Sequence, residues 1–343
     1  MPLRGAGAFA FSSCRLAGIR YLSLTTAMTP TAKVDSSSGR IGFDIHLPQR
    51  TATEDVCRSR RTFLKGTASV MLAGAGSALL AACGGGGPGS GDAAATPRLA
   101  SVENFRDVGG AASGYPTIDG KVVRRGVFYR SNVLAPSAAD KATLDALGIA
   151  VVYDLRTPGE IARTADALPV GAGYQTINVI GADDVVSAAY DTPADAIAAM
   201  ERAQRAYVLG AAQRQGFGAL LMQLAATAGA QVIHSSYGKD RTGWAAALML
   251  SIANVPFDVI MQDYLLSNTY AAASISARVA AVSTQSGQAA ALADAPAFSV
   301  QPSFLQVAFD QVHETFGTMN AYLTQGLGLS PDQIDRLHDR LVV

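Results

Sequence analysis

A ten-residue polar segment between two apolar runs constrains this chain more than any other feature. Residues 234–243 are His-Ser-Ser-Tyr-Gly-Lys-Asp-Arg-Thr-Gly. The apolar run at 231–233 predicts a strand before this segment, and the longer apolar run at 244–252 predicts a helix after it. A tight loop between a strand and a helix gathers backbone N–H groups at the positive end of the helix dipole. The sequence therefore predicts an anion-binding loop, with Arg241 placed to donate to two phosphate oxygens.

Two other interpretations of this segment fail on spacing. A nucleotide-binding P-loop needs G-x-x-x-x-G-K-S/T, but Asp240 follows Gly238-Lys239 and Ile233 stands where the first glycine is required. A serine hydrolase needs G-x-S-x-G, whereas Ser235 is flanked by other residue types.

Composition narrows the classes of partner and cofactor. The chain has 27 Lys and Arg against 27 Asp and Glu, so no basic excess indicates a nucleic-acid partner. The predicted globular part contains His234, His313 and His338 as its histidines, without a His/Cys/Asp cluster at the spacing of metal ligands. We therefore expect no metal site and no cofactor. The sequence leaves the oligomeric state open.

Residues 59–65, Ser-Arg-Arg-Thr-Phe-Leu-Lys, resemble a twin-arginine export signal. The apolar stretch after them, 68–82, is shorter than the roughly 20 helical residues that span a bilayer. It ends in Leu-Ala-Ala followed by Cys83, which resembles a bacterial lipobox. We expect an exported lipoprotein, anchored through lipidated Cys83 on the periplasmic or extracellular side. An uncleaved anchor or a buried helix is the alternative.

The chain divides into four parts by composition. Residues 1–58 are a polar leader, either disordered or the product of a start site placed too early, with Met28 as an alternative start. Residues 59–83 form the signal, 84–96 form a glycine-rich flexible tether, and 97–343 form one domain.

Within that domain, strand and helix patterns alternate and then give way to helices. We expect a hairpin at 115–123, strands at 126–129, 149–153, 174–179 and 231–233, and helices from 137 to 148, 194–209 and 216–228. Thr157-Pro158-Gly159-Glu160 has capping-box spacing, as has the segment from Ser330. The pattern predicts an α/β domain with a small mixed, mostly parallel sheet flanked by helices and a helical C-terminal half. The loop would lie where a central strand ends.

The loop resembles the phosphatase loop of cysteine-dependent protein-tyrosine phosphatases, His-Cys-(five residues)-Arg-Thr/Ser-Gly, with Ser235 in place of the cysteine. Segments 104–110, 129–131, 154–157 with Glu160, and 263–268 are similar to bacterial secreted tyrosine phosphatases related to the mycobacterial triple-specificity enzyme. The resemblance covers about residues 101–343. It implies a protein-tyrosine-phosphatase-like fold, no metal, and activity on phosphotyrosine, in some members also on phosphoserine, phosphothreonine or phosphoinositides. A phosphorylated protein or a phosphoinositide would be the substrate.

The resemblance also assigns roles by position. Ser235 takes the nucleophile's place, Arg241 binds phosphate, and Asp240 is the general acid, with Asp154 competing for that role. Lys239 adds a second cation, and His234 shapes the loop. Tyr237 replaces a residue that is usually small and would alter access to the loop. The phosphate cradle consists of Ser236, Tyr237, Gly238, Lys239, Asp240 and Arg241.

Serine changes the chemistry at position 235. A thiol in such a loop ionises near neutral pH, whereas a serine hydroxyl is far more basic and needs a metal or a strong base. Two explanations remain: an engineered Cys→Ser trap of a phosphatase, or a natural pseudophosphatase that binds phosphorylated ligands without turnover.

Other residues have a structural alternative to a functional role. Asp154 and Arg156 could form a buried ion pair that fixes the sheet edge. Residues 104–107 would fix the N-terminal segment rather than contact substrate, and Trp244 would belong to the core. The Ala/Ser/Gln-rich segment 270–300 is either a helical lid over the loop or a mobile surface insertion.

Overall fold

The computed structural model describes residues 96–111, 113–185 and 188–343. The predicted leader, the export signal with Cys83, and nearly all of the tether lie outside the described residues. Within the described part, no helix is both long and apolar enough to cross a membrane.

A five-stranded sheet forms the centre of the domain. Its order is β1-β2-β5-β3-β4; β1 is antiparallel to β2 and all other neighbours are parallel. The strands are β1 Arg106–Asp107, β2 Phe128–Ser131, β3 Ile149–Asp154, β4 Gly173–Thr176 and β5 Ala230–His234. Because β5 lies in the middle, its last residue, His234, pairs with Ser131 on one side and Asp154 on the other. The predicted mixed, mostly parallel sheet with a central strand before the loop is confirmed.

Helices make up most of the remaining chain. They are α1 Ala138–Ala146, α2 Pro158–Arg163, α3 Pro193–Leu209, α4 Ala211–Ala226, α5 Asp240–Ile252, α6 Phe257–Tyr270, α7 Ala272–Ser286, α8 Gln288–Phe298, α9 Pro302–Phe316, α10 Met319–Ala321 and α11 Pro331–Leu341, with a π-helical turn, η1, at Tyr322–Gly326. The predicted helical C-terminal half is confirmed.

Two predicted boundaries are wrong for identifiable reasons. Helix α4 begins at Ala211 rather than at Gly216, because Gly210 is its extended N-cap residue and the helix continues through two glycines that permit close packing. A Cβ on Gly216 would lie 2.9 Å from the Cα of Val179, and one on Gly218 would lie 2.2 Å from a backbone oxygen. Strand β2 begins two residues later than expected, because Gly126 has φ +79° and occupies a turn.

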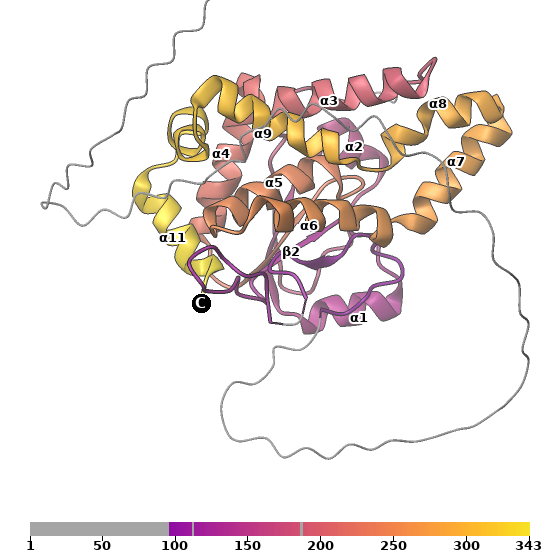
Figure 1. Ribbon diagram of the computed structural model, residues 1–343. Helices are drawn as coiled ribbons and strands as arrows, with labels where there is room; N and C mark the ends of the chain where they lie inside the picture. Colours follow the sequence, from indigo (N-terminus) through magenta and orange to yellow (C-terminus); the bar gives the residue numbers. More distant parts are fainter. Residues whose placement is uncertain (1–95, 112, 186–187) are drawn as a thin grey trace, which may run out of the picture. The chain divides into compact units, whose positions relative to one another are not determined.

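Strand alternation divides the core between the two faces of the sheet. Val152 and Val232 pack in one cluster with Leu144 of α1, whereas their neighbours Tyr153 and Ile233 pack in a second cluster with α4, α5 and α9. Figure 1 shows α1 on the opposite side of the strands from α5 and α6. Trp244 is fully buried in the second cluster, edge-on to Phe309, so its predicted place in the core is confirmed.

Two further features bear on the sequence predictions: the capping box of α2 and the helices of segment 270–300. The capping box at α2 is confirmed: Thr157 accepts from the Glu160 amide, and the Glu160 carboxylate accepts from the Thr157 amide. The segment 270–300 is helical, with α7 and α8 packed together and separated by Gly287 at φ +90°. Helix α8 also packs against α3 (Figure 1).

Candidate functional site

The predicted loop connects the end of β5 to the first turn of α5, as its sequence indicated. Gly238 makes this connection possible. It has φ +62°, and a Cβ at this position would lie 2.3 Å from the backbone oxygen of Ser131 on the neighbouring strand. A larger residue would therefore both strain the backbone and push the loop off the sheet.

The carbonyl groups of the loop are held from outside. Asn104 Nδ2 donates to the oxygens of Tyr237 at 3.2 Å and Gly238 at 2.9 Å, and Arg130 Nη2 donates to the same Gly238 oxygen at 2.9 Å. The amides of residues 235–239 donate to no protein acceptor among the described residues. With the carbonyls engaged elsewhere, these N–H groups remain available to an anion, as in other phosphate-binding loops.

A buried carboxylate, Asp263, holds the arginines beside the loop in place. Asp263 of α6 accepts from Arg106 Nε at 3.1 Å and from Arg130 Nη1 at 2.8 Å. Burial alone would raise the pKa of Asp263, but the charges of the two arginines outweigh it and lower the pKa. Asn104 and Arg106, expected to fix the N-terminal segment, thus also hold the loop.

Asp107 accepts from the amides of Gly109 and Gly126, and burial raises its pKa to about 6.

Arg241 is held by a carboxylate that the sequence did not assign to the site. Its Nη1 and Nη2 donate to Glu160 at 2.7 and 2.6 Å, and Ser236 Oγ donates to the same carboxylate at 2.5 Å. Burial would raise the pKa of Glu160, but the hydrogen bonds and charge of Arg241 outweigh it and lower the pKa to about 2. The pair keeps Arg241 charged and fixed, and among the described residues no acceptor is bonded to its Nε. The sequence signals for Glu160 were its capping-box position and its place in the segment that resembles the secreted tyrosine phosphatases.

Ser235 lies at the base of the loop and is 2% exposed. Its Oγ forms a hydrogen bond of 2.9 Å with Thr242 Oγ1. Among the described residues no ionisable side chain forms a hydrogen bond with Ser235, so no base is positioned to take its proton.

Lys239 and Asp240, next to each other in the loop, form an ion pair. Lys239 Nζ lies 2.8 Å from Asp240 Oδ2 and donates to the Ser299 oxygen at 3.3 Å. The second carboxylate oxygen of Asp240 is buried and has no hydrogen-bond partner. That oxygen lies at the N-terminus of α5, beside the loop.

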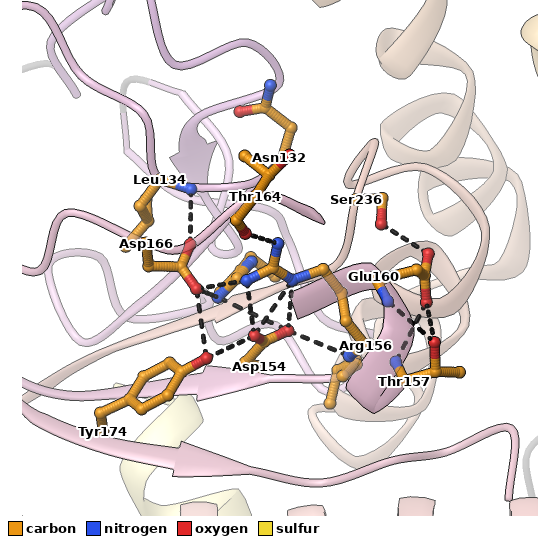
Figure 2. Close-up of polar contacts among 12 residues, drawn as sticks. Asn132, Leu134, Asp154, Arg156, Thr157, Glu160, Thr164, Asp166, Tyr174 and Ser236 are labelled. Carbon is orange, nitrogen blue, oxygen red and sulfur yellow. Dashed lines mark hydrogen bonds and ion pairs between the residues drawn. The ribbon is translucent and has the colours of Figure 1, made fainter. Parts of the chain in front are cut away.

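Asp154, the competing candidate acid, belongs to a buried ion pair. It accepts from Arg156 Nε and Nη2 and from Tyr174 Oη at 2.6 Å, and Arg156 Nη2 also donates to Asp166 at 2.5 Å. Figure 2 shows Arg156 between the two carboxylates. Burial would raise the pKa of Asp154, but the hydrogen bonds of Arg156 and the nearby charges lower it. The side chain is fully buried and ionised, so the geometry favours the structural alternative for Asp154.

Comparison with known proteins identifies the family of this chain. The model of the tyrosine phosphatase family matches residues 97–343. The chain belongs to the tyrosine phosphatase family. By that membership it is a phosphatase, a hydrolase of phosphate esters.

Relatives of this phosphatase span most of its domain. It is 31% identical to a candidate tyrosine-protein phosphatase of Cupriavidus necator, over 68% of this chain and 85% of that protein. It is 27% identical to the triple specificity protein phosphatase PtpB of Mycobacterium tuberculosis, over 72% of this chain and 99% of that protein. The solved catalytic core of Siw14 overlaps 46% of this chain and 77% of its own, at 17% identity and a TM-score of 0.22, too low to support a shared fold by itself.

One group of possible metal ligands occurs in the described part of this phosphatase. Ligand atoms of Asp154, Asp166 and His234 lie within 4.8 Å of one another, a proximity that the sequence did not predict. His234 is fully buried with no hydrogen bond to either ring nitrogen, and burial lowers its pKa, so the ring is neutral. Arg156 already donates to both carboxylates, so a guanidinium lies where a metal ion would have to approach them.

Proposed function

We propose that this phosphatase binds phosphate monoesters, foremost phosphotyrosine of proteins, in the loop 235–241. The observation that carries the proposal is the pairing of unsatisfied loop amides with a guanidinium that Glu160 fixes in place. The names of the relatives support tyrosine-protein substrates, and "triple specificity" supports phosphoserine, phosphothreonine or phosphoinositides as further substrates.

Turnover in the manner of this family needs cysteine at position 235. A thiolate there attacks phosphorus, and the ester P–O bond breaks while Asp240 donates a proton to the leaving oxygen. Arg241 and the loop amides bind the three equatorial oxygens as charge redistributes. Water then attacks the phosphocysteine, releasing phosphate and the thiolate. The serine hydroxyl stays protonated near neutral pH, so the chain with Ser235 binds phosphate esters with little or no turnover.

Two origins of Ser235 are consistent with this proposal. One is a Cys→Ser substitution that traps substrate in a phosphatase, and the other is a natural pseudophosphatase that captures phosphorylated ligands. Among the described residues, the side chain of Ser235 bonds to the hydroxyl of Thr242 and to no base. This supports binding without turnover in either case. The codon at position 235 in the genome distinguishes the two.

Phosphatase assays on the purified chain and on Ser235→Cys test the nucleophile. With p-nitrophenyl phosphate we expect the cysteine variant to exceed the serine form by at least about 1,000-fold, because only the thiol ionises in the loop. Arg241→Met in the cysteine background should lose most of that activity. Equal turnover by the serine and cysteine forms would contradict the assignment.

We further propose that the chain is exported and held at a membrane by lipidated Cys83, with the glycine-rich tether as a spacer. The twin-arginine and lipobox resemblances support this proposal. Labelled fatty acid should attach to the expressed chain and not to Cys83→Ala. Absence of label on both would remove the anchor.

A further inference from the structure

Two cavities beside the loop are lined by one common residue, Glu103. The first has room for about one water and lies between the loop and α7, where Tyr237, Lys239 and Arg278 line it. The second has a volume of about 240 Å³ and is lined by Arg98, Asn104 and Tyr270. We call the two cavities together the flanking groove. Asn104 connects the groove to the site, because its amide holds the loop carbonyls.

Arg278 in the first cavity is a cation on which the charges of Asp240 and Glu103 act from beyond ion-pair distance. Its guanidinium carbon lies 4.0 Å from the ring centre of Tyr237 and 4.1 Å from that of Phe298, so aromatic rings pack against it. No carboxylate among the described residues forms an ion pair with it, and burial lowers its pKa by removing water from the charge. A guanidinium packed against aromatic rings keeps N–H donors that can bind a carboxylate through two hydrogen bonds.

Arg98 repeats this arrangement in the second cavity. Its guanidinium carbon lies 3.8 Å from the ring centre of Tyr270, and no described carboxylate pairs with it. Lys239 is paired with Asp240, so the unpaired charges of the flanking groove are two arginines against Glu103 alone. The groove therefore carries a net positive charge.

We propose that the flanking groove binds the residues beside the phosphotyrosine of an acidic phosphopeptide, with Arg278 and Arg98 donating to its carboxylates. This inference rests on the proposed function, because the loop must hold the phosphate while the groove holds the flanking residues. The two arginines stack on different aromatic rings in separate cavities. An extended peptide distributes its carboxylates along its length, which suits two separate cavities, whereas a compact inositol headgroup carries its phosphates on one ring.

Peptide binding to the chain with Ser235 tests the proposal without turnover. Fluorescence anisotropy would compare a phosphotyrosine peptide flanked by Asp and Glu with the same peptide flanked by Asn and Gln, and with phenyl phosphate as competitor. We expect the acidic peptide to bind at least about 10-fold more tightly at 0.1 M salt. Arg278→Met should remove most of this preference and change the affinity for phenyl phosphate by less than about 2-fold.

Matched variants complete the test. Arg202→Met removes an exposed arginine of α3 that lines neither cavity and should change nothing. Glu103→Gln removes the one unpaired acid of the groove and should tighten acidic-peptide binding. Equal binding of the acidic and neutral peptides to the unmodified chain would overturn the proposal.

Tighter, Arg278-dependent binding of a soluble bisphosphorylated phosphoinositide than of the acidic peptide would likewise overturn it. Failure of phenyl phosphate to bind at all would instead reject the proposed function of the loop.

Discussion

At the scale of single residues, the site depends on a few positions that set the charge of its arginine and the path of its loop. Glu160 keeps Arg241 charged and immobile, and Gly238 lets the loop approach β2. Glu160 lies 81 positions before Arg241 in the sequence, and Gly238 approaches Ser131 on the neighbouring strand. Each role can be tested with one substitution.

Glu160 should make stability depend on pH. Its pKa is lowered from 4.5 to about 2, so the stabilisation is complete above pH 4.5 and is lost as the pH falls toward 2. The shift corresponds to about 3 kcal/mol. Glu160→Gln should lower the free energy of unfolding by roughly 3–5 kcal/mol at pH 7, because Arg241 is left buried and unpaired. In urea denaturation between pH 7 and 3, the free energy of unfolding should fall less for this variant than for the unmodified chain.

Glu314→Gln is the control for that experiment, since Glu314 is exposed on α9. It should keep the pH dependence of the unmodified chain. The role given to Glu160 would be wrong if the two variants had the same pH profile.

Gly238→Ala should abolish anion binding. The added Cβ would lie 2.3 Å from the Ser131 oxygen at a φ of +62°, so the loop must move. We expect tungstate affinity, measured by calorimetry, to fall at least about 10-fold, since the loop amides no longer converge. Gly120→Ala has the same kind of φ, +80°, but open space around the new Cβ, so it should cost about 1–2 kcal/mol of stability and leave tungstate affinity unchanged.

At the scale of secondary-structure elements, α6 joins β1 and β2 through one buried carboxylate. Asp263 pairs with Arg106 of β1 and Arg130 of β2, and Arg130 reaches on to the loop. A second contact reinforces this packing, because a Cβ on Gly243 of α5 would lie 2.8 Å from the ring of Tyr264 on α6. The position of the loop therefore depends on how α5, α6 and the strands pack together.

Asp263→Asn should lower the free energy of unfolding by about 3–5 kcal/mol, because two buried arginines lose their shared counter-charge. It should also weaken tungstate binding, because Arg130 no longer holds the Gly238 carbonyl in place. Asp258→Asn, at an exposed position in the first turn of the same helix, should cost less than about 1 kcal/mol. Equal losses for the two variants in urea denaturation would contradict this account.

At the scale of the whole molecule, both faces of the sheet are covered by residues of the predicted domain. The members of the two core clusters all lie between Leu99 and Val342, and the family match spans 97–343. A core of this extent is large enough for independent folding.

A fragment of residues 97–343 should therefore unfold with a free energy within about 1 kcal/mol of that of the full chain, and bind tungstate equally well. Tungstate at 100 times its dissociation constant should stabilise both by about 2.7 kcal/mol. A fragment that is less stable by more than about 2 kcal/mol would show that residues before 97 contribute to the fold.

The sequence alone determined the local features of this protein. Short continuous apolar runs predicted strands, the capping box at Thr157 predicted helix α2, and the polar segment 234–243 predicted the anion-binding loop. These features depend on residues close together in the chain. Helix α4 was placed wrongly, because Gly216 and Gly218 serve contacts with Val179 and Leu327 that local sequence does not reveal.

Tertiary structure alone decided which distant side chains meet. It brought Glu160 to Arg241, placed Asp263 between Arg106 and Arg130, enclosed Asp154 in an ion pair with Arg156, and stacked Arg278 on Tyr237. Such contacts depend on strand order and helix packing, and the burial they create sets the pKa of each group. The sequence thus predicts an anion-binding loop, and the packing of the sheet and helices decides how its arginine is held and which carboxylates are buried in ion pairs.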